Sequence, residues 1–171
     1  MTSNASAAAS GAPTRIERTL TIQAEPAAIL SAWGDIEIQP QLFEGAATYL
    51  GPDARGGSTW EVHAPLGRRP RFVLLPDGET AGYVRHRVED EVGLWMRSEL
   101  RVRPARARPG VEATLTVDYR VDGLLAGWLA RLVDPAPALL VGQALRRLRA
   151  RVEAGEIPTL ARNPSARAST H

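Results

Sequence analysis

The feature that most constrains the fold is a change of hydrophobic period late in the chain. Up to Val121, apolar and polar residues alternate in short stretches. In the last of these, Val111–Val121, apolar residues fall on one side and Glu, Thr, Asp and Arg on the other. From Ala136 to Ala154 an apolar stripe recurs at helical spacing. Period-two alternation predicts half-buried strands, whereas the longer period predicts an amphipathic helix. This order favours a sheet with one apolar face and a long helix that covers it.

Turn residues separate most of the alternating stretches, and one of the predicted turns is Pro76-Asp77-Gly78. Short turns between consecutive strands predict an antiparallel sheet. The predicted strands are Ile16–Ala24, Ala46–Leu50, Ser58–Ala64, Arg69–Leu75, Tyr83–Glu89, Leu94–Arg103 and Val111–Val121.

Two short helices are expected after the first strand, over Pro26–Trp33 and Ile36–Phe43. A short amphipathic stretch, Leu124–Val133, precedes the long helix. The sequence therefore predicts an α+β fold in a single domain over residues 14–157. We expect the Ala/Ser-rich residues 1–13 and the polar residues 158–171 to be disordered tails.

Composition excludes several classes of function. The 171 residues carry a net charge of +2, and all 21 basic residues are arginine, so a strongly basic nucleic-acid binder is disfavoured. The chain has no Cys and three His, without the spacing of a metal site, so we expect neither metal nor cofactor. Its most apolar window contains charges and prolines, which argues against a transmembrane helix. We expect a cytoplasmic protein.

Three polar residues fall on the apolar side of different predicted strands: His86, Ser98 and Tyr119. Either these three side chains are hydrogen-bonded inside the core, or they are the polar groups of an apolar ligand pocket. On the second interpretation these three are also the candidate catalytic residues. The predicted ligand-binding residues are Trp33, Phe43, Trp60, Phe72, His86, Met96, Ser98, Tyr119 and Trp128.

Four segments, in order, resemble the SRPBCC superfamily of START-related helix-grip proteins. The first strand with Ala24–Trp33 resembles the family's strand, small-x-Pro and helix start, and Asp35–Gly45 resembles its next segment. The final alternating strand ends in Tyr119-Arg120-Val121. Leu145–Thr159, which ends in GEIPT, resembles the end of bacterial members described as polyketide cyclase/dehydrase or as lipid-transport-like.

This resemblance implies a seven-stranded antiparallel sheet curved around a long C-terminal helix, with two short helices closing one end. It also implies a deep apolar cavity between sheet and helix that holds a lipid, a polyketide or a similar molecule. Some members catalyse aldol cyclisation and dehydration with pocket Arg, Tyr and Ser/His groups. Most strand arginines here point outward by alternation, so no catalytic Arg/Tyr set can be matched residue by residue.

The sequence leaves three functions open. The first is binding of a small hydrophobic molecule between sheet and helix. The second is a metal-independent polyketide cyclase/dehydrase in which His86 or Tyr119 acts as the acid or base. The third is a membrane-surface or protein-interaction module that uses Leu124–Val133 and the arginines of the last helix. The ligand, the oligomeric state and the biosynthetic context do not follow from the sequence, which also leaves open whether the chain is an enzyme.

Overall fold

The computed structural model describes residues 12–63, 69–91, 93–106, 109–122 and 137–155. The predicted element order is confirmed, with two short helices after the first strand and one long helix after the last. The elements are β1 Thr14–Ile22, α1 Pro26–Gly34, α2 Gln39–Leu42, β2 Ala47–Pro52, β3 Ser58–Val62, β4 Arg71–Thr80, β5 Tyr83–Glu91, β6 Leu94–Pro104, β7 Val111–Val121 and α4 Pro137–Ala154.

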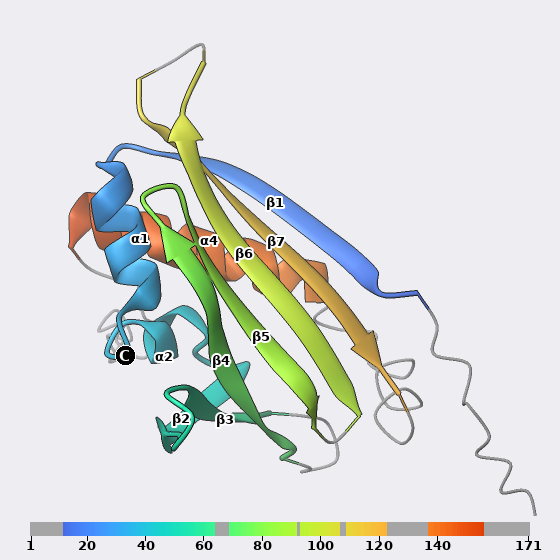
Figure 1. Cartoon of the computed structure of the whole chain (residues 1–171). Coiled ribbons are helices and arrows are strands. Elements are labelled where there is room, and N and C mark those ends of the chain that lie inside the picture. The colour runs from blue at the N-terminus through green and yellow to red at the C-terminus, as the bar shows by residue number, and fades with distance from the viewer. Residues whose placement is uncertain (1–11, 64–68, 92, 107–108, 123–136, 156–171) are drawn as a thin grey trace, which may run out of the picture.

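The strands form one seven-stranded antiparallel sheet, as the sequence predicts (Figure 1). Their order is β1-β7-β6-β5-β4-β3-β2, which leaves β1 and β2 at the two edges. Strands β2 to β7 pair with their neighbours in the chain, whereas β1 pairs with the distant β7, from Thr14 opposite Tyr119 to Ile22 opposite Val111. The sheet is curved, so it has a concave inner face and a convex outer face.

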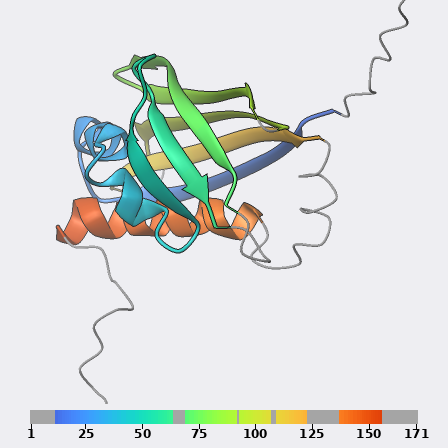
Figure 2. The same ribbon diagram turned by 90° about the horizontal axis from the view of Figure 1, so that it is seen from below.

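The helices lie on the inner face (Figure 2). Helix α4 contacts β1 and β7, and α1 and α2 pack against it at one end of the sheet. Apolar residues of α4 recur every three or four positions, so they share one side of the helix and become buried together. These buried residues are Val141, Ala144, Leu145 and Leu148.

The predicted turn at Pro76-Asp77-Gly78 is wrong. These residues lie inside β4, which continues to Thr80 before the chain turns into β5. The pairing with β5 shifts register between Pro76 and Glu79, and Gly78 adopts a φ of 117°, a conformation that favours glycine. A bulge within the strand therefore accommodates the proline and glycine that suggested a turn. The first strand also starts and ends two residues earlier than predicted.

Parts of the sequence-based prediction lie outside the described residues. These are the amphipathic stretch Leu124–Val133 and nearly all of the two tails, so the domain boundaries at residues 14 and 157 stay predictions. None of the described helices is long and apolar enough to cross a membrane.

Candidate functional site

The middle of the inner face carries four of the predicted site residues, on three neighbouring strands. His86 of β5 pairs directly with Ser98 of β6. Two residues away on β6, Met96 pairs with Tyr119 of β7. Paired residues and residues two apart on a strand point to the same face of a sheet, so these four side chains form one contiguous group. We call His86, Met96, Ser98 and Tyr119 the inner patch.

The inner patch borders the main buried core on the inner face, and Val88 of β5, which pairs with Met96, is itself only 1% exposed. In the adjacent row, Val84, Leu100 and Leu115 are paired across β5, β6 and β7 and are 8%, 0% and 2% exposed. These three belong to the same core as the buried residues of α1, which contacts β5 and β6. The residues of the inner patch are only half-buried. The patch is therefore accessible surface at the border of the core.

The three polar side chains of the patch have no hydrogen-bond partner among the described residues. His86 and Ser98 face each other without a hydrogen bond, so the hydroxyl is not activated as in a nucleophile–base pair. Burial lowers the pKa of His86 below its usual 6.5. At neutral pH the ring is therefore uncharged and offers one donor and one acceptor nitrogen.

A second group of predicted residues forms an aromatic cluster between α1, α2 and the β2–β3 edge of the sheet. The rings of Trp33 and Phe43 meet edge-on with centroids 5.8 Å apart, and Phe43 meets Trp60 in the same way at 5.8 Å. Phe72 pairs with Trp60 across β3 and β4. The sequence analysis missed Tyr49, whose ring centroid lies 5.5 Å from that of Trp60. The alternation of β2 could have revealed it, because Tyr49 shares a face with the half-buried Ala47.

The two buried indoles differ in how their N–H groups are satisfied. Trp60 Nε1 donates a hydrogen bond to Ser58 Oγ at 2.8 Å. Trp33 is 4% exposed, and its Nε1 has no partner in the described part of the chain. A buried donor without a partner costs about 1–3 kcal/mol. An oxygen atom of a bound molecule is one way to recover that cost.

The inner face of the central strands carries no charge over its described side chains. The inward residues from Val84 to Val88, from Leu94 to Val102 and from Val111 to Val121 are aliphatic or are the members of the inner patch. No group of three or more His, Asp or Glu side chains in the described ranges is placed to hold a metal ion. This surface can bind apolar groups and orient a carbonyl or hydroxyl. The remaining predicted residue, Trp128, lies outside the described residues.

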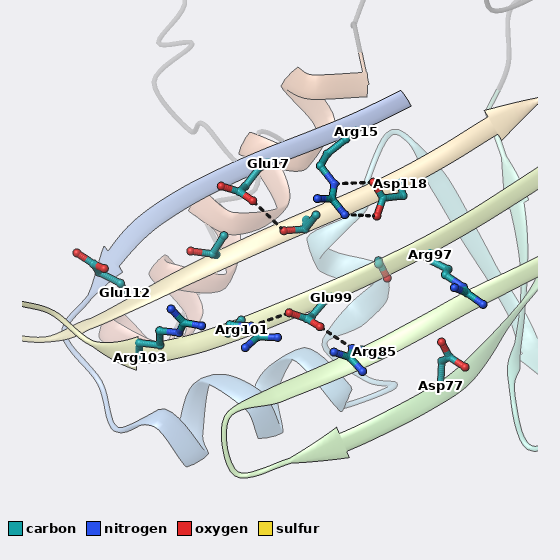
Figure 3. A pocket seen from close by; sticks show the side chains of 13 residues that line it. Arg15, Glu17, Asp77, Arg85, Arg97, Glu99, Arg101, Arg103, Glu112 and Asp118 are labelled. Atoms are coloured by element: carbon teal, nitrogen blue, oxygen red, sulfur yellow. Dashed lines mark hydrogen bonds and ion pairs between the residues drawn. The ribbon is translucent and has the colours of Figure 1, made fainter. Parts of the chain in front are cut away.

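Two hollows lie elsewhere on the molecule. A hollow of about 600 Å³ on the outer face is bordered mainly by arginine and carboxylate side chains (Figure 3), and of the predicted site residues Ser98 also borders it. A groove of about 370 Å³ runs between β1 and α4, with Leu20 and Leu139 at its sides and Arg18 and Arg146 at its rim. Neither corresponds to the predicted ligand pocket.

The arginines of α4, predicted as a membrane or partner surface, are used partly within the fold. Arg147 Nη1 donates hydrogen bonds to the carbonyl oxygens of Leu42 and Glu44, at 3.1 and 2.9 Å. These bonds attach α4 to the last residue of α2 and to the segment that follows it. Arg146 is exposed.

Comparison with known proteins identifies solved structures that have a similar fold. No family model and no curated protein matches the sequence. A protein of known structure from Deinococcus radiodurans is similar, with 19% identity, a TM-score of 0.62 and coverage of 84% of this chain and 100% of that one. Norcoclaurine synthase from Thalictrum flavum is 16% identical, with a TM-score of 0.52 and coverage of 86% and 95%. The di-domain ARO/CYC protein StfQ of the steffimycin biosynthetic pathway is 10% identical, with a TM-score of 0.58 and coverage of 85% and 53%.

These likenesses extend over most of the chain and agree with the topology described above. The motifs at Ala24–Trp33 and Asp35–Gly45 contribute α1 and α2, and Leu145–Ala154 forms the second half of α4. The chain therefore has the helix-grip fold.

Proposed function

We propose that the chain binds a small hydrophobic molecule, such as a polyketide or another lipid-like compound, against the inner face of its sheet. One observation carries the proposal. His86, Ser98 and Tyr119 lie together on the accessible part of an otherwise apolar face, and none has a hydrogen-bond partner among the described residues. A few polar groups on an apolar wall are typical of small-molecule sites.

Apolar contact would supply most of the affinity, at about 25 cal/mol for each Å² of ligand and protein surface that leaves water. The polar groups of the inner patch would fix orientation by bonding a carbonyl or hydroxyl oxygen. Trp33 Nε1 adds a further unsatisfied donor near the aromatic cluster. Support also comes from two proteins that share the fold: one is an enzyme, norcoclaurine synthase, and the other is an ARO/CYC protein from a biosynthetic pathway.

A fluorescent probe tests the proposal directly. N-phenyl-1-naphthylamine is neutral and apolar, and it fluoresces strongly once it leaves water. We expect saturable binding to the full chain. The Ser98→Asp variant places a carboxylate within the inner patch, and we expect it to weaken binding about tenfold or more, because an ion beside a dry apolar ligand loses hydration.

Thr114→Asp is the matched control, since it introduces the same carboxylate on the outer face of β7, opposite Arg101. We expect it to bind the probe as the unmodified chain does, and circular dichroism confirms that both variants fold. Absence of saturable binding to the unmodified chain, or equal weakening by both substitutions, contradicts the proposal. Native mass spectrometry of co-purifying molecules then identifies the natural ligand.

The neutral state of His86 favours a second candidate function, acid–base catalysis on a bound carbonyl compound. An uncharged imidazole on an accessible apolar face can accept a proton from a carbon next to a carbonyl group. The hydroxyl of Tyr119 or Ser98 would donate a hydrogen bond to the carbonyl oxygen as charge develops there. This is the chemistry of a metal-independent cyclase/dehydrase.

A further inference from the structure

Four arginines on the outer face of β5 and β6 gather around one carboxylate. Arg85 of β5 is paired directly with Glu99 of β6. Arg97 and Arg101 lie two residues to either side of Glu99 on the same strand, and Arg103 is two residues further on. Residues two apart share a face, so all five side chains lie on the outer face, with Arg97 and Arg103 at opposite ends of the group (Figure 3).

The next strand, β7, places its carboxylates opposite the two outermost arginines, Asp118 opposite Arg97 and Glu112 opposite Arg103. Thr116 is paired with Glu99 and Thr114 with Arg101, so hydroxyl groups stand opposite the centre of the group. Hydroxyls neutralise no charge. Over the whole hollow, five arginines face five carboxylates, but three of the arginines, Arg85, Arg97 and Arg101, adjoin the single carboxylate of Glu99.

Glu99 and an aromatic ring hold two of the guanidinium groups in place. Arg85 Nε donates to one oxygen of Glu99, and Arg101 Nε donates to the other at 2.7 Å. The ring of Tyr83 lies beneath both, with its centroid 4.2 Å from the Arg85 guanidinium carbon and 5.7 Å from that of Arg101. Both arginines are ordered through Nε, and their terminal Nη groups have no hydrogen-bond partner among the described residues. Their side chains remain 40% and 37% exposed, within reach of a solute.

The other two arginines have no ion pair within the described ranges. Arg97 lies over Trp95, 5.6 Å from the ring centroid, and the side chain of Arg103 makes no hydrogen bond to a described residue. The nearby carboxylate of Asp118 is already occupied, because Arg15 donates to it twice, at 2.7 and 2.9 Å.

Asp77, on β4, is likewise occupied, by Arg87 at 2.9 Å. These pairings leave donors without acceptors at the centre of the outer hollow, which measures about 600 Å³.

We infer that this hollow binds an oxyanion, the phosphate or carboxylate group of a small polar molecule, between the terminal nitrogens of Arg85, Arg101 and Arg103. Guanidinium groups match the geometry of both anions and form charge-assisted hydrogen bonds with them. A bound anion also reduces the repulsion among arginines that lie on one face at neighbouring positions. The side chains of the inner patch point to the other face of the sheet, so this second site does not rest on the proposed function.

Titration of the full chain with inorganic phosphate tests the inference. Chloride is exchanged for phosphate at constant ionic strength, and the Nε–H signals of Arg85 and Arg101 are followed by NMR. We expect saturable shifts of these two signals. A parallel titration with benzoate distinguishes the two anions: saturation by benzoate alone assigns the hollow to carboxylates, and saturation by phosphate alone assigns it to phosphate groups.

Variants locate the bound anion. Arg103→Gln removes a guanidinium that holds no described partner, so the fold should be unaffected, and we expect affinity to fall about fivefold from the loss of one charge-assisted contact. Arg149→Gln on α4 makes the same change in net charge on the opposite side of the sheet, and we expect it to bind as the unmodified chain does. The inference is overturned if neither anion gives saturable shifts beyond those of chloride, or if Arg149→Gln weakens binding as much as Arg103→Gln.

Discussion

At the scale of single residues, His86 is the group whose surroundings most define what the inner face can do. It lies between Val84 and Val88 on β5 and faces Ser98, and the described side chains of the inner face around it carry no charge. Desolvation is the cause of its lowered pKa. A base with a lowered pKa keeps its proton-accepting form at pH values where an ordinary histidine is half protonated.

Replacement of His86 separates binding from catalysis. Exchange of the α-protons of 2-tetralone in D₂O, followed by NMR, measures proton abstraction next to a carbonyl. If the chain is an enzyme, exchange is fast above the pKa of His86 and is lost as the pH falls through it, so the acidic midpoint lies below 6.5. His86→Gln should abolish this exchange and retain binding of the naphthylamine probe.

The same substitution at His63 is the matched control. His63 is exposed and follows the last residue of β3, with its Nε2 2.6 Å from Thr48 Oγ1. We expect His63→Gln to exchange normally. Exchange that survives in His86→Gln, or is lost equally in both variants, shows that His86 is not the base.

The sequence predicts which face of the sheet a side chain occupies, but it does not predict the contacts of that side chain. Strand parity alone placed His86, Ser98 and Tyr119 on the inner face, because side chains alternate strictly along a strand. This alternation does not predict which polar atoms form hydrogen bonds or ion pairs. The unpartnered indole of Trp33 and the bridging of two arginines by Glu99 depend on contacts between distant segments, which no local pattern encodes.

At the scale of elements, α4 is the part of the fold whose burial the sequence predicts best. Its apolar period places Leu145 and Leu148 against the sheet, and both are 0% exposed. The interior of β4 shows the opposite case. Pro76 and Gly78 have the local signature of a turn, yet pairing with β5 continues beyond them through a bulge. Tertiary pairing overrides a local signal there, so the boundary could not be predicted from the sequence.

Truncation of a leucine on α4 should reveal this burial. Leu148→Ala removes a fully buried side chain between helix and sheet, and we expect it to lower the free energy of unfolding by about 2–5 kcal/mol. Leu139→Ala on the same helix is the control, because Leu139 is 41% exposed, and we expect a change within about 0.5 kcal/mol. Urea denaturation followed by tryptophan fluorescence measures both. An equal loss of unfolding free energy in the two variants would show that the side of α4 that carries Leu148 is not buried against the sheet.

At the scale of the whole molecule, the pairing of β1 with β7 joins the start of the described chain to the strand that precedes α4. Turn signals predict hairpins between consecutive strands, and β2 to β7 follow that rule. No comparable signal predicts which strand lies beside the first one. The resemblance to the helix-grip family supplied the overall arrangement in advance, and the structure adds the β1–β7 register, with Ile16 opposite Val117.

Two N-terminal deletions test the predicted domain start at residue 14 together with the role of β1. Residues 2–11 belong to the tail that the sequence predicts to be disordered, so we expect their deletion to leave the urea midpoint unchanged. Deletion of residues 2–18 also removes Ile16, which is 8% exposed, the paired hydrogen bonds between Arg15 and Asp118, and half of the β1–β7 pairing. Loss of one buried isoleucine alone costs about 2–5 kcal/mol, so the longer deletion should destabilise the chain by more than this or prevent folding.

Destabilisation by the short deletion would place the domain start before residue 14. An unchanged urea midpoint after the longer deletion would mean that the first half of β1 contributes nothing to the core. The burial of Ile16 and its pairing with β7 argue against that outcome.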